Sequence, residues 1–182
     1  MENNKVNAAS ALERLKAGNK KYIGSSRSAG DISPEKRLYT AENGQKPYAV
    51  IVSCSDSRVI PESIFSAGIG DLFVIRVAGN VVDNIQLGSV EYAVEHLGCS
   101  LVLVLGHTGC GAVGAAQHEN DGYIKHITDE IKRAIGTEKD AVKASVLNVK
   151  SSVAKIKQSL SNSALVTGAL YHTDSGIVDF DI

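Results

Sequence analysis

The feature that most constrains the fold is a set of three short apolar runs spaced at similar intervals. They begin at Tyr48 (YAVIVS), Leu72 (LFVIRV) and Ser100 (SLVLVLG). Their length and their Val and Ile content are typical of strands that are buried on both faces of a sheet. A short helix-like stretch over 62–65 separates the first two runs, and a longer one that ends at Gly98 separates the second from the third. This alternation predicts parallel strands that are joined by right-handed crossovers.

The flanking segments complete an α/β prediction. Residues 7–18 carry an Asn cap, two leucines and a closing glycine, which predicts a short amphipathic helix, whereas the polar stretch 25–44 predicts an extended loop or a broken helix. A helical region from 124 to about 160 is interrupted near Gly136, and the segment from Ala164 then supplies a strand and, through the turn TDSG, a hairpin partner. We predict a single domain with a mostly parallel central sheet flanked by helices and an antiparallel C-terminal edge strand, divided into an N-terminal helical arm and loop over 1–44 and an α/β domain over 45–182.

Composition narrows the classes of function. The formal net charge is -1, and this chain lacks the basic excess that a nucleic-acid or membrane surface normally shows. No apolar run approaches the roughly 20 residues that span a bilayer, and the N-terminus lacks the pattern of a secretory leader. The three cysteines are an odd number, which favours metal binding or catalysis over a disulfide framework. We therefore expect a cytoplasmic protein that acts on a small molecule and binds neither nucleic acid nor membrane.

Side chains that bind metals follow two of the apolar runs. Cys54 comes directly after the first run, and His107 and Cys110 follow the third. Because the carboxyl ends of parallel strands share one edge of a sheet, these side chains can converge there. Imidazole and thiolate are donors that Zn²⁺ accepts at about 2.0 to 2.3 Å. Three protein ligands would leave a fourth tetrahedral position for water, as in catalytic zinc sites.

A carboxylate and a guanidinium follow Cys54 at Asp56 and Arg58. Two thiolates neutralise a divalent ion, so its water is less acidified than in a site of three neutral histidines, for which the reference pKa is about 7. Asp56 can compensate for this weaker acidification by accepting a hydrogen bond from the bound water and orienting it as a nucleophile. Alternatively, Asp56 can become the fourth ligand and close the zinc site. Arg58 can pair with Asp56 and hold it off the metal, so the state of the site depends on whether that pair forms.

Each of these residues also has an ordinary interpretation. A cysteine after a strand is usually a buried hydrophobic residue, and an Asp–Arg pair is most often a weak surface ion pair. Their joint placement favours the zinc site. Cys99 begins a buried strand without a polar partner nearby, and we predict that it is structural. The other histidines are predicted at helix ends or on the surface, namely His96, His118, His126 and His172.

A dinucleotide-binding turn is a rival interpretation, because residues 109–114 (GCGAVG) match G-x-G-x-x-G. That fold also needs an acidic residue at the end of a second strand about 20 positions further on. Asp129 and Glu130 instead fall in a helix-like stretch, and the motif does not explain His107 or Cys110. We favour the interpretation that the glycines of 109–114 let the backbone pack closely around a metal.

Four separated blocks of this sequence resemble the beta class of carbonic anhydrases, in order and in spacing. The resemblance extends from about Leu12 to the C-terminal strand, and several blocks in order are more specific than any one of them. The blocks are CSDSR at Cys54, GDLFVIRVAGN at Gly70, SVEYAVEHLG at Ser89 and GHTGCGAV at Gly106.

The resemblance implies a zinc enzyme that hydrates carbon dioxide reversibly to bicarbonate and a proton. It implies zinc ligands at Cys54, His107 and Cys110 and a catalytic dyad of Asp56 and Arg58, with Asp56 as the fourth ligand in a closed state. Some relatives with the same ligands hydrolyse carbonyl sulfide or carbon disulfide, so the ligands alone leave the substrate open. A zinc or redox-sensing domain without catalytic activity is the further alternative.

The resemblance also implies a substrate pocket and an oligomer. Gln45, Phe73 and Tyr92 are expected to line the carbon dioxide pocket, where an apolar slot suits a small neutral substrate and the Gln amide can bond an oxygen of bicarbonate. Packing in the core is the ordinary alternative for Phe73 and Tyr92. Members of the family pair as homodimers, often assembled further, with pockets at the subunit interface. Leu12 and Leu15 of the N-terminal helix are expected to contact the partner.

The sequence departs from the family pattern in two places. Val77 replaces a residue that is often polar, which could alter the pocket wall. The chain contains no Trp, although some bacterial members use one in an effector site for bicarbonate, so we do not expect that mode of regulation. His118 or His126 could carry the released proton to solvent if either lies near the mouth of the site, but buffer alone would suffice.

Overall fold

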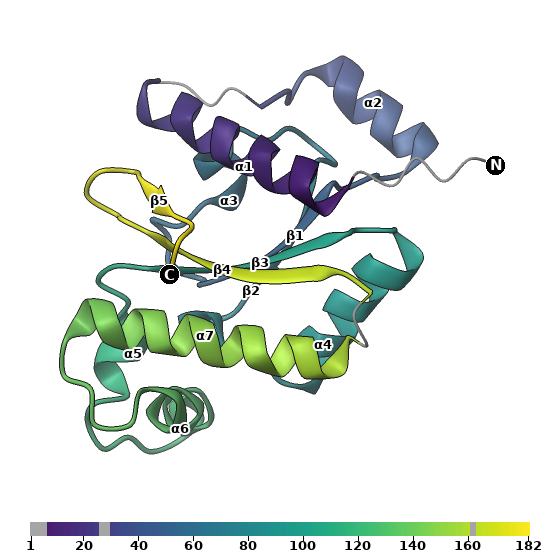
Figure 1. Ribbon diagram of the computed structural model, residues 1–182. Helices are drawn as coiled ribbons and strands as arrows, with labels where there is room; N and C mark the ends of the chain where they lie inside the picture. The colour runs from purple at the N-terminus through teal and green to yellow at the C-terminus, as the bar shows by residue number, and fades with distance from the viewer. Residues whose placement is uncertain (1–6, 26–29, 161–162) are drawn as a thin grey trace.

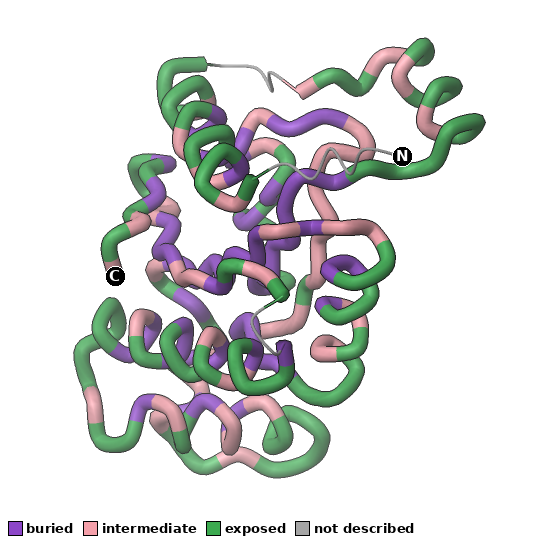
Figure 2. The backbone as a smooth tube through the Cα atoms, turned by 45° about the vertical axis from the view of Figure 1, so that its right-hand side comes forward, coloured by how far each residue is buried: buried purple, intermediate pink, exposed green. Residues whose placement is uncertain are grey.

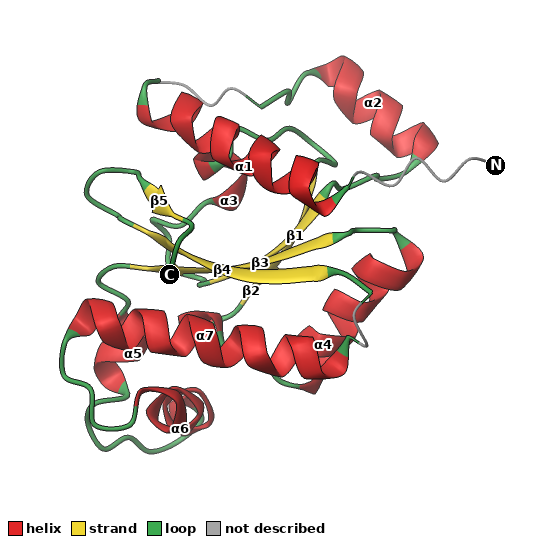
Figure 3. Ribbon diagram, in the orientation of Figure 1, coloured by secondary structure: helices red, strands yellow, loops and turns green. Residues whose placement is uncertain are grey.

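A five-stranded sheet forms the centre of the molecule in the computed structural model, which describes residues 7–25, 30–160 and 163–182. The strand order is β2-β1-β3-β4-β5, in which β1 to β4 run parallel and β5 pairs antiparallel with β4 (Figure 3). The predicted fold class is therefore confirmed. The strands are β1 (Ala49–Ser53), β2 (Leu72–Arg76), β3 (Leu101–His107), β4 (Leu165–Tyr171) and β5 (Val178–Asp179).

Helices cover both faces of this sheet (Figure 1). One face carries α1 (Ala8–Ile23) and α3 (Pro61–Ile64), with α2 (Pro34–Asn43) further out. The helices on the other face are α4 (Asn84–Glu91), which continues into a π-helical turn (Tyr92–His96), α5 (Gly111–Ala115), α6 (Ile124–Ile135) and α7 (Ala141–Ser159). The break predicted near Gly136 falls between α6 and α7.

Apolar side chains fill the space between the sheet and each helical layer. Every residue of β1 and of β3 is buried, as expected for strands that are covered on both faces (Figure 2). The residues of β2 are only partly buried, and Arg76 at its end is exposed. The expectation that all three apolar runs are fully buried is therefore wrong for β2, because this strand lies at the edge of the sheet.

Helix α1 differs from the prediction in length and in what it contacts. Gly18 was expected to end the helix, but α1 continues to Ile23. A Cβ atom at Gly18 would lie 1.9 Å from the carbonyl oxygen of Phe65, so this glycine permits a close approach of two backbone segments rather than a helix end. Leu15 is fully buried in the core of its own chain, and Leu12 packs against the same core. The expectation that these leucines contact a partner is therefore wrong for Leu15.

The stretch predicted as a loop or broken helix contains a regular helix, α2, over its described part, while residues 26–29 lie outside the described chain. Ser33 caps α2 by accepting a hydrogen bond from the Lys36 amide, and Pro34 occupies its first turn. No residue of α2 is buried. Local capping therefore defines this helix, which lies beside the segment that leads into β2 without burying any of its own residues.

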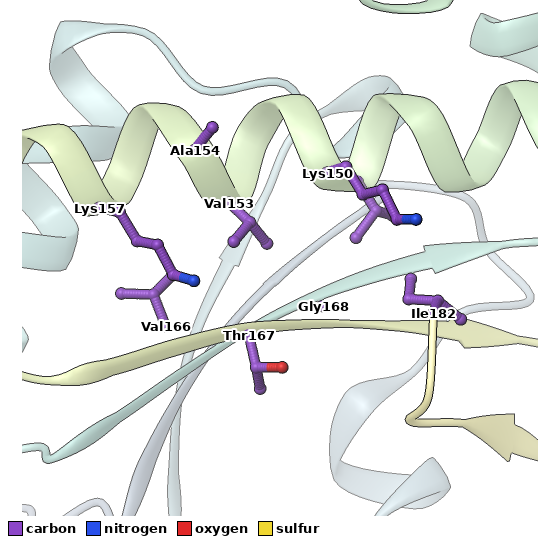
Figure 4. A pocket seen from close by; sticks show the side chains of 9 residues that line it. Lys150, Val153, Ala154, Lys157, Val166, Thr167, Gly168 and Ile182 are labelled. Carbon is purple, nitrogen blue, oxygen red and sulfur yellow. The ribbon is translucent and has the colours of Figure 1, made fainter.

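A small cavity of about 300 Å³ lies between part of α7 and β4 (Figure 4). Val153 and Val166 line it, together with Lys150 and Lys157 of α7. The cavity lies apart from the metal-binding residues of the sequence analysis, none of which lines it. Among the described residues, no helix combines the length and the apolar character needed to cross a membrane.

Candidate metal centre

The three predicted ligands meet at the carboxyl edge of the sheet. Cys54 directly follows β1, and Cys110 precedes α5. His107 is the last residue of β3 rather than a residue beyond it. Strands β1 and β3 are adjacent and parallel, so the ends of both strands reach the same edge. The two sulfur atoms and an imidazole nitrogen lie within 4.8 Å of one another, and all three residues are buried.

The imidazole of His107 presents one free nitrogen. Its Nδ1 lies 3.0 Å from the backbone oxygen of Thr108, so the tautomer with a proton on Nδ1 donates to that carbonyl. The buried Nε2 then carries a lone pair and has no hydrogen-bond partner in the described chain. A buried nitrogen without a partner is costly unless it binds something, and metal-binding histidines characteristically donate their second nitrogen to a carbonyl.

The two thiols interact closely. Pairing with the Cys110 thiol lowers the pKa of Cys54, and the same pairing, together with burial, raises the pKa of Cys110. The Cys54 sulfur also accepts hydrogen bonds from the backbone N–H groups of Gly79 at 3.2 Å and Asp56 at 3.4 Å. A thiolate, a second thiol and a free imidazole nitrogen fit a zinc ion, which takes such donors in tetrahedral sites.

Asp56 and Arg58 form the pair that the sequence analysis considered. Nε of Arg58 donates to one carboxylate oxygen of Asp56 at 3.0 Å, and a terminal nitrogen donates to the other at 2.8 Å. This fork holds the pKa of Asp56 well below its usual range. The same guanidinium donates to the backbone oxygen of Gly109 at 3.1 Å, and it thereby links the turns that carry Cys54 and Cys110. The nearer Asp56 oxygen lies 4.0 Å from Nε2 of His107.

Arg76 was missed in the sequence analysis, although it contacts the same turn. It donates from Nε to the backbone oxygen of Cys54 at 3.1 Å and from a terminal nitrogen to that of Asp56 at 2.8 Å. A signal for it was present, because Arg76 is the one charged residue in the apolar run that forms β2. A charge at the end of such a strand indicates that the edge of the sheet is polar there.

The structure does not bring the predicted pocket residues to the metal ligands within one chain. Phe73 lies opposite Val50, four residues before Cys54 and so roughly 13 Å from it along the strand direction. The Tyr92 ring lies 6.1 Å from the Phe73 ring, and His96 stacks on Tyr92 with 5.4 Å between ring centroids. Gln45 is exposed in the segment before β1. Phe73 near the start of β2, Tyr92 beside it and Gln45 before β1 therefore lie toward the amino ends of these strands, away from the ligand cluster at their carboxyl ends.

The remaining cysteine and histidines lie outside the cluster. Cys99 is buried and donates to the backbone oxygen of Pro47 at 3.3 Å, and burial raises its pKa to about 11. The expectation that Cys99 has no polar partner nearby is therefore wrong, while its position outside the cluster leaves the structural role as a prediction. His118 and His126, named as proton carriers, are exposed. Val77 packs in part against the apolar cluster that contains Cys54 and Cys110.

Comparisons with known proteins agree on one family. The model of the family described as carbonic anhydrase matches residues 49–178, from the first residue of β1 to the first residue of β5. The chain is 42% identical over 136 residues to carbonic anhydrase 2 of Mycobacterium tuberculosis, a match that covers 71% of this chain and 65% of the relative. It is 51% identical over 77 residues to a carbonic anhydrase of Pseudomonas aeruginosa, over 39% of this chain and 35% of the relative. The chain thus spans less than two thirds of each of these relatives.

Solved structures show the same architecture. The Coccomyxa beta-carbonic anhydrase in complex with acetazolamide has a TM-score of 0.73 at 25% identity, over 82% of this chain and 78% of that one. A beta-carbonic anhydrase of Aspergillus fumigatus also has a TM-score of 0.73 at 25% identity, over 95% of this chain and 90% of that one.

Proposed function

The chain belongs to the carbonic anhydrase family, and from this premise we propose that it binds zinc and catalyses the reversible hydration of carbon dioxide to bicarbonate and a proton. The observation that carries the proposal is the buried cluster of Cys54, His107 and Cys110, whose ligand atoms lie within 4.8 Å of one another. The unpartnered Nε2 of His107 and the low pKa of Cys54 support a metal ion as the missing partner.

The side chains around the cluster have separate tasks. Bound zinc would supply a Lewis acid that makes water acidic enough to act as a nucleophile near neutral pH. Asp56 would accept a hydrogen bond from the reacting water and orient it toward the substrate carbon, which is a positioning effect. Arg58 holds the Asp56 carboxylate in place by a two-point contact. Arg76 fixes the backbone of the same turn, so that Cys54 and Asp56 keep their relative positions.

We propose that a second copy of this chain completes the carbon dioxide pocket. Gln45, Phe73 and Tyr92 lie away from the cluster of their own chain, and the Tyr92 side chain is 47% exposed. Helix α2 exposes Leu38 at 61% and Tyr39 at 57% and buries nothing. A ten-residue helix is marginal without packing, so a partner surface is expected there. A homodimer, or an assembly of dimers, would cover α2 and bring the pocket residues of one subunit to the zinc ligands of the other.

Zinc analysis together with stopped-flow hydration of carbon dioxide tests the enzyme. We expect one zinc per chain and hydration above the buffer rate in the wild type, and loss of both in Cys110→Ala. A Cys110→Ala variant that keeps stoichiometric zinc would contradict the ligand assignment. Purified, reduced protein that binds zinc but leaves the hydration rate unchanged would favour the zinc domain without catalytic activity. Carbonyl sulfide and carbon disulfide are assayed alongside, because faster turnover of either would favour the hydrolase alternative.

Mixing two inactive variants tests the shared pocket. Cys110→Ala removes a zinc ligand and Tyr92→Ala removes a pocket wall. If the pocket comes from the partner, a mixed dimer contains one site with both parts intact, and unfolding and refolding the two variants together restores part of the activity. If each chain supplies its own pocket, every site in the mixture stays defective and no activity returns.

A further inference from the structure

We infer that Asn148 of α7 is a positioning residue for the metal centre, because it fixes the backbone turn whose N–H group donates to the sulfur of Cys54. The inference rests on the proposed function, since it concerns how strongly that sulfur donates to zinc. It assigns a role at the site to a helix that contributes no ligand.

Asn148 reaches the metal centre through one backbone unit. Its side chain is buried, with 2% of the residue exposed, and Nδ2 donates to the backbone oxygen of Gly79 at 2.7 Å. The N–H of Gly79 in turn donates to the Cys54 sulfur at 3.2 Å. The carbonyl of Gly79 therefore accepts a hydrogen bond from α7, while its N–H donates one to the sulfur of Cys54. These two bonds together fix the orientation of Gly79.

The conformation of Gly79 shows why such support is needed. Its φ is 68° and its ψ is 19°, within a 3-10 turn over Ala78–Asn80. Residues with a side chain rarely adopt this left-handed conformation. A Cβ atom here would also lie 2.7 Å from Cδ1 of Ile131. Glycine is therefore the residue that suits this position, but glycine also has the greatest backbone freedom. The hydrogen bond from Asn148 to the Gly79 carbonyl restricts that freedom.

A second polar side chain of α7 holds the same turn. Ser152, one helical turn after Asn148, donates from its hydroxyl to the backbone oxygen of Asn80 at 3.1 Å. Both residues are buried, and buried polar side chains are unfavourable unless they are hydrogen-bonded. Two consecutive turns of the helix thus direct their polar groups at consecutive peptide units beside Cys54.

Packing of α7 on the sheet does not require these polar groups. Val149 and Ile156 bury the apolar side of the helix in the core, and Val153 packs against them. Lys150 and Lys157 border the cavity between α7 and β4 (Figure 4). Apolar residues therefore attach the helix to the sheet, while Asn148 and Ser152 are directed at the turn. This division indicates that the polar pair serves the turn rather than the core.

The chemical consequence concerns the charge on the ligand. Two thiolates neutralise a divalent ion, which makes it a weaker Lewis acid than a site with neutral ligands. A hydrogen bond to a ligating sulfur draws electron density away from it, and such outer contacts tune the metal. The Gly79 N–H offsets part of the negative charge on the Cys54 sulfur, and Asn148 keeps that N–H directed at the sulfur. Loss of Asn148 would let the turn move and would change both metal affinity and thiolate donation.

Three variants of α7 test this inference. Asn148→Ala removes the bond to Gly79, and Ser152→Ala removes the bond to Asn80. Ser145→Ala is the matched control, because Ser145 is also buried on α7 but donates within the helix, to Ala141 at 2.9 Å. Zinc affinity is measured by competition with a chelator, and folding by thermal unfolding. We expect Asn148→Ala to bind zinc roughly 10- to 100-fold more weakly than the wild type. The zinc affinity of Ser152→Ala should lie between those of Asn148→Ala and the wild type, and that of Ser145→Ala should equal the wild-type affinity.

A spectroscopic measurement separates positioning from general destabilisation. In protein loaded with cadmium-113, a through-bond coupling between the metal and the Gly79 amide proton reports the hydrogen bond to Cys54. We expect this coupling in the wild type and in Ser145→Ala, and its loss or reduction in Asn148→Ala. If Asn148→Ala does not fold, Ser152→Ala tests the same turn through its bond to Asn80, and a smaller reduction of the coupling is expected there. Wild-type zinc affinity together with an unchanged coupling in the folded variant would overturn the inference, whereas a wild type that binds no zinc would overturn the proposed function instead.

Discussion

Substitution of Gly79 by alanine gives the sharpest test of how this turn is built. The left-handed φ of 68° costs an L-residue about 1–2 kcal/mol. The new Cβ would lie 2.7 Å from Cδ1 of Ile131, which is fully buried and cannot move into solvent, and overpacking of this kind costs about 1–3 kcal/mol more. We therefore expect Gly79→Ala to lower the free energy of unfolding by about 2–5 kcal/mol.

Gly122 provides a control for the cost of the left-handed backbone conformation alone. Its φ is also positive, at 59°, but a Cβ atom there would meet nothing within 4 Å. Gly122→Ala should therefore cost only the strain of about 1–2 kcal/mol. Urea unfolding with saturating zinc and after chelation measures both variants, and the chelated samples exclude a change in zinc affinity as the cause. If both variants lost the same stability, the close contact with Ile131 would not be real and the reasoning about this turn would fail.

Three further substitutions test separate parts of the site and core. Asp56→Asn should keep its zinc but lose about 100-fold or more in hydration rate, measured by stopped flow, and unchanged turnover would remove Asp56 from the mechanism. Arg58→Lys should also keep zinc and lose turnover, because an ammonium cannot make the two-point contact with the carboxylate, and wild-type rates would show that this contact is dispensable. Burial raises the pKa of Tyr48 to about 12, so the folded protein keeps this proton while the unfolded chain loses it near 10, and stability should fall between those pH values by about 3 kcal/mol. Urea unfolding of Tyr48→Phe should show a shallower alkaline decline, and an identical decline would assign the loss to other groups.

The sheet and the metal ligands could be predicted because their signals are local. The run LVLVL over 101–105 is apolar at every position and rich in valine, which is typical of a strand that is covered on both faces. Cys54 directly follows one such run, and His107 and Cys110 end or closely follow another, so parallel pairing brings all three to one edge. These predictions needed no knowledge of how the helices pack.

The missed features depend on contacts between distant parts of the chain. Asn148 and Gly79 are 69 positions apart, and an asparagine within a helical pattern has no local signature of the turn that it supports. Gly18 resembled a helix end because the Phe65 backbone that approaches it is not visible in the sequence around it. Helix α2 was overlooked because its apolar residues do not face the core of its own chain.

The arrangement around Asp56 explains why the structure shows the site without a carboxylate in the ligand cluster. The ligand-to-ligand separation in a tetrahedral site with bonds of about 2.0–2.2 Å is about 3.4 Å, and the nearer Asp56 oxygen lies 4.0 Å from Nε2 of His107. A small rotation of the side chain would close this difference, so distance alone does not keep Asp56 off the metal. Its backbone is fixed by Arg76, and its carboxylate is occupied on both oxygens by Arg58. The Arg58 side chain is 55% exposed, so the two-point contact that holds the Asp56 carboxylate is reached by solvent from the Arg58 side.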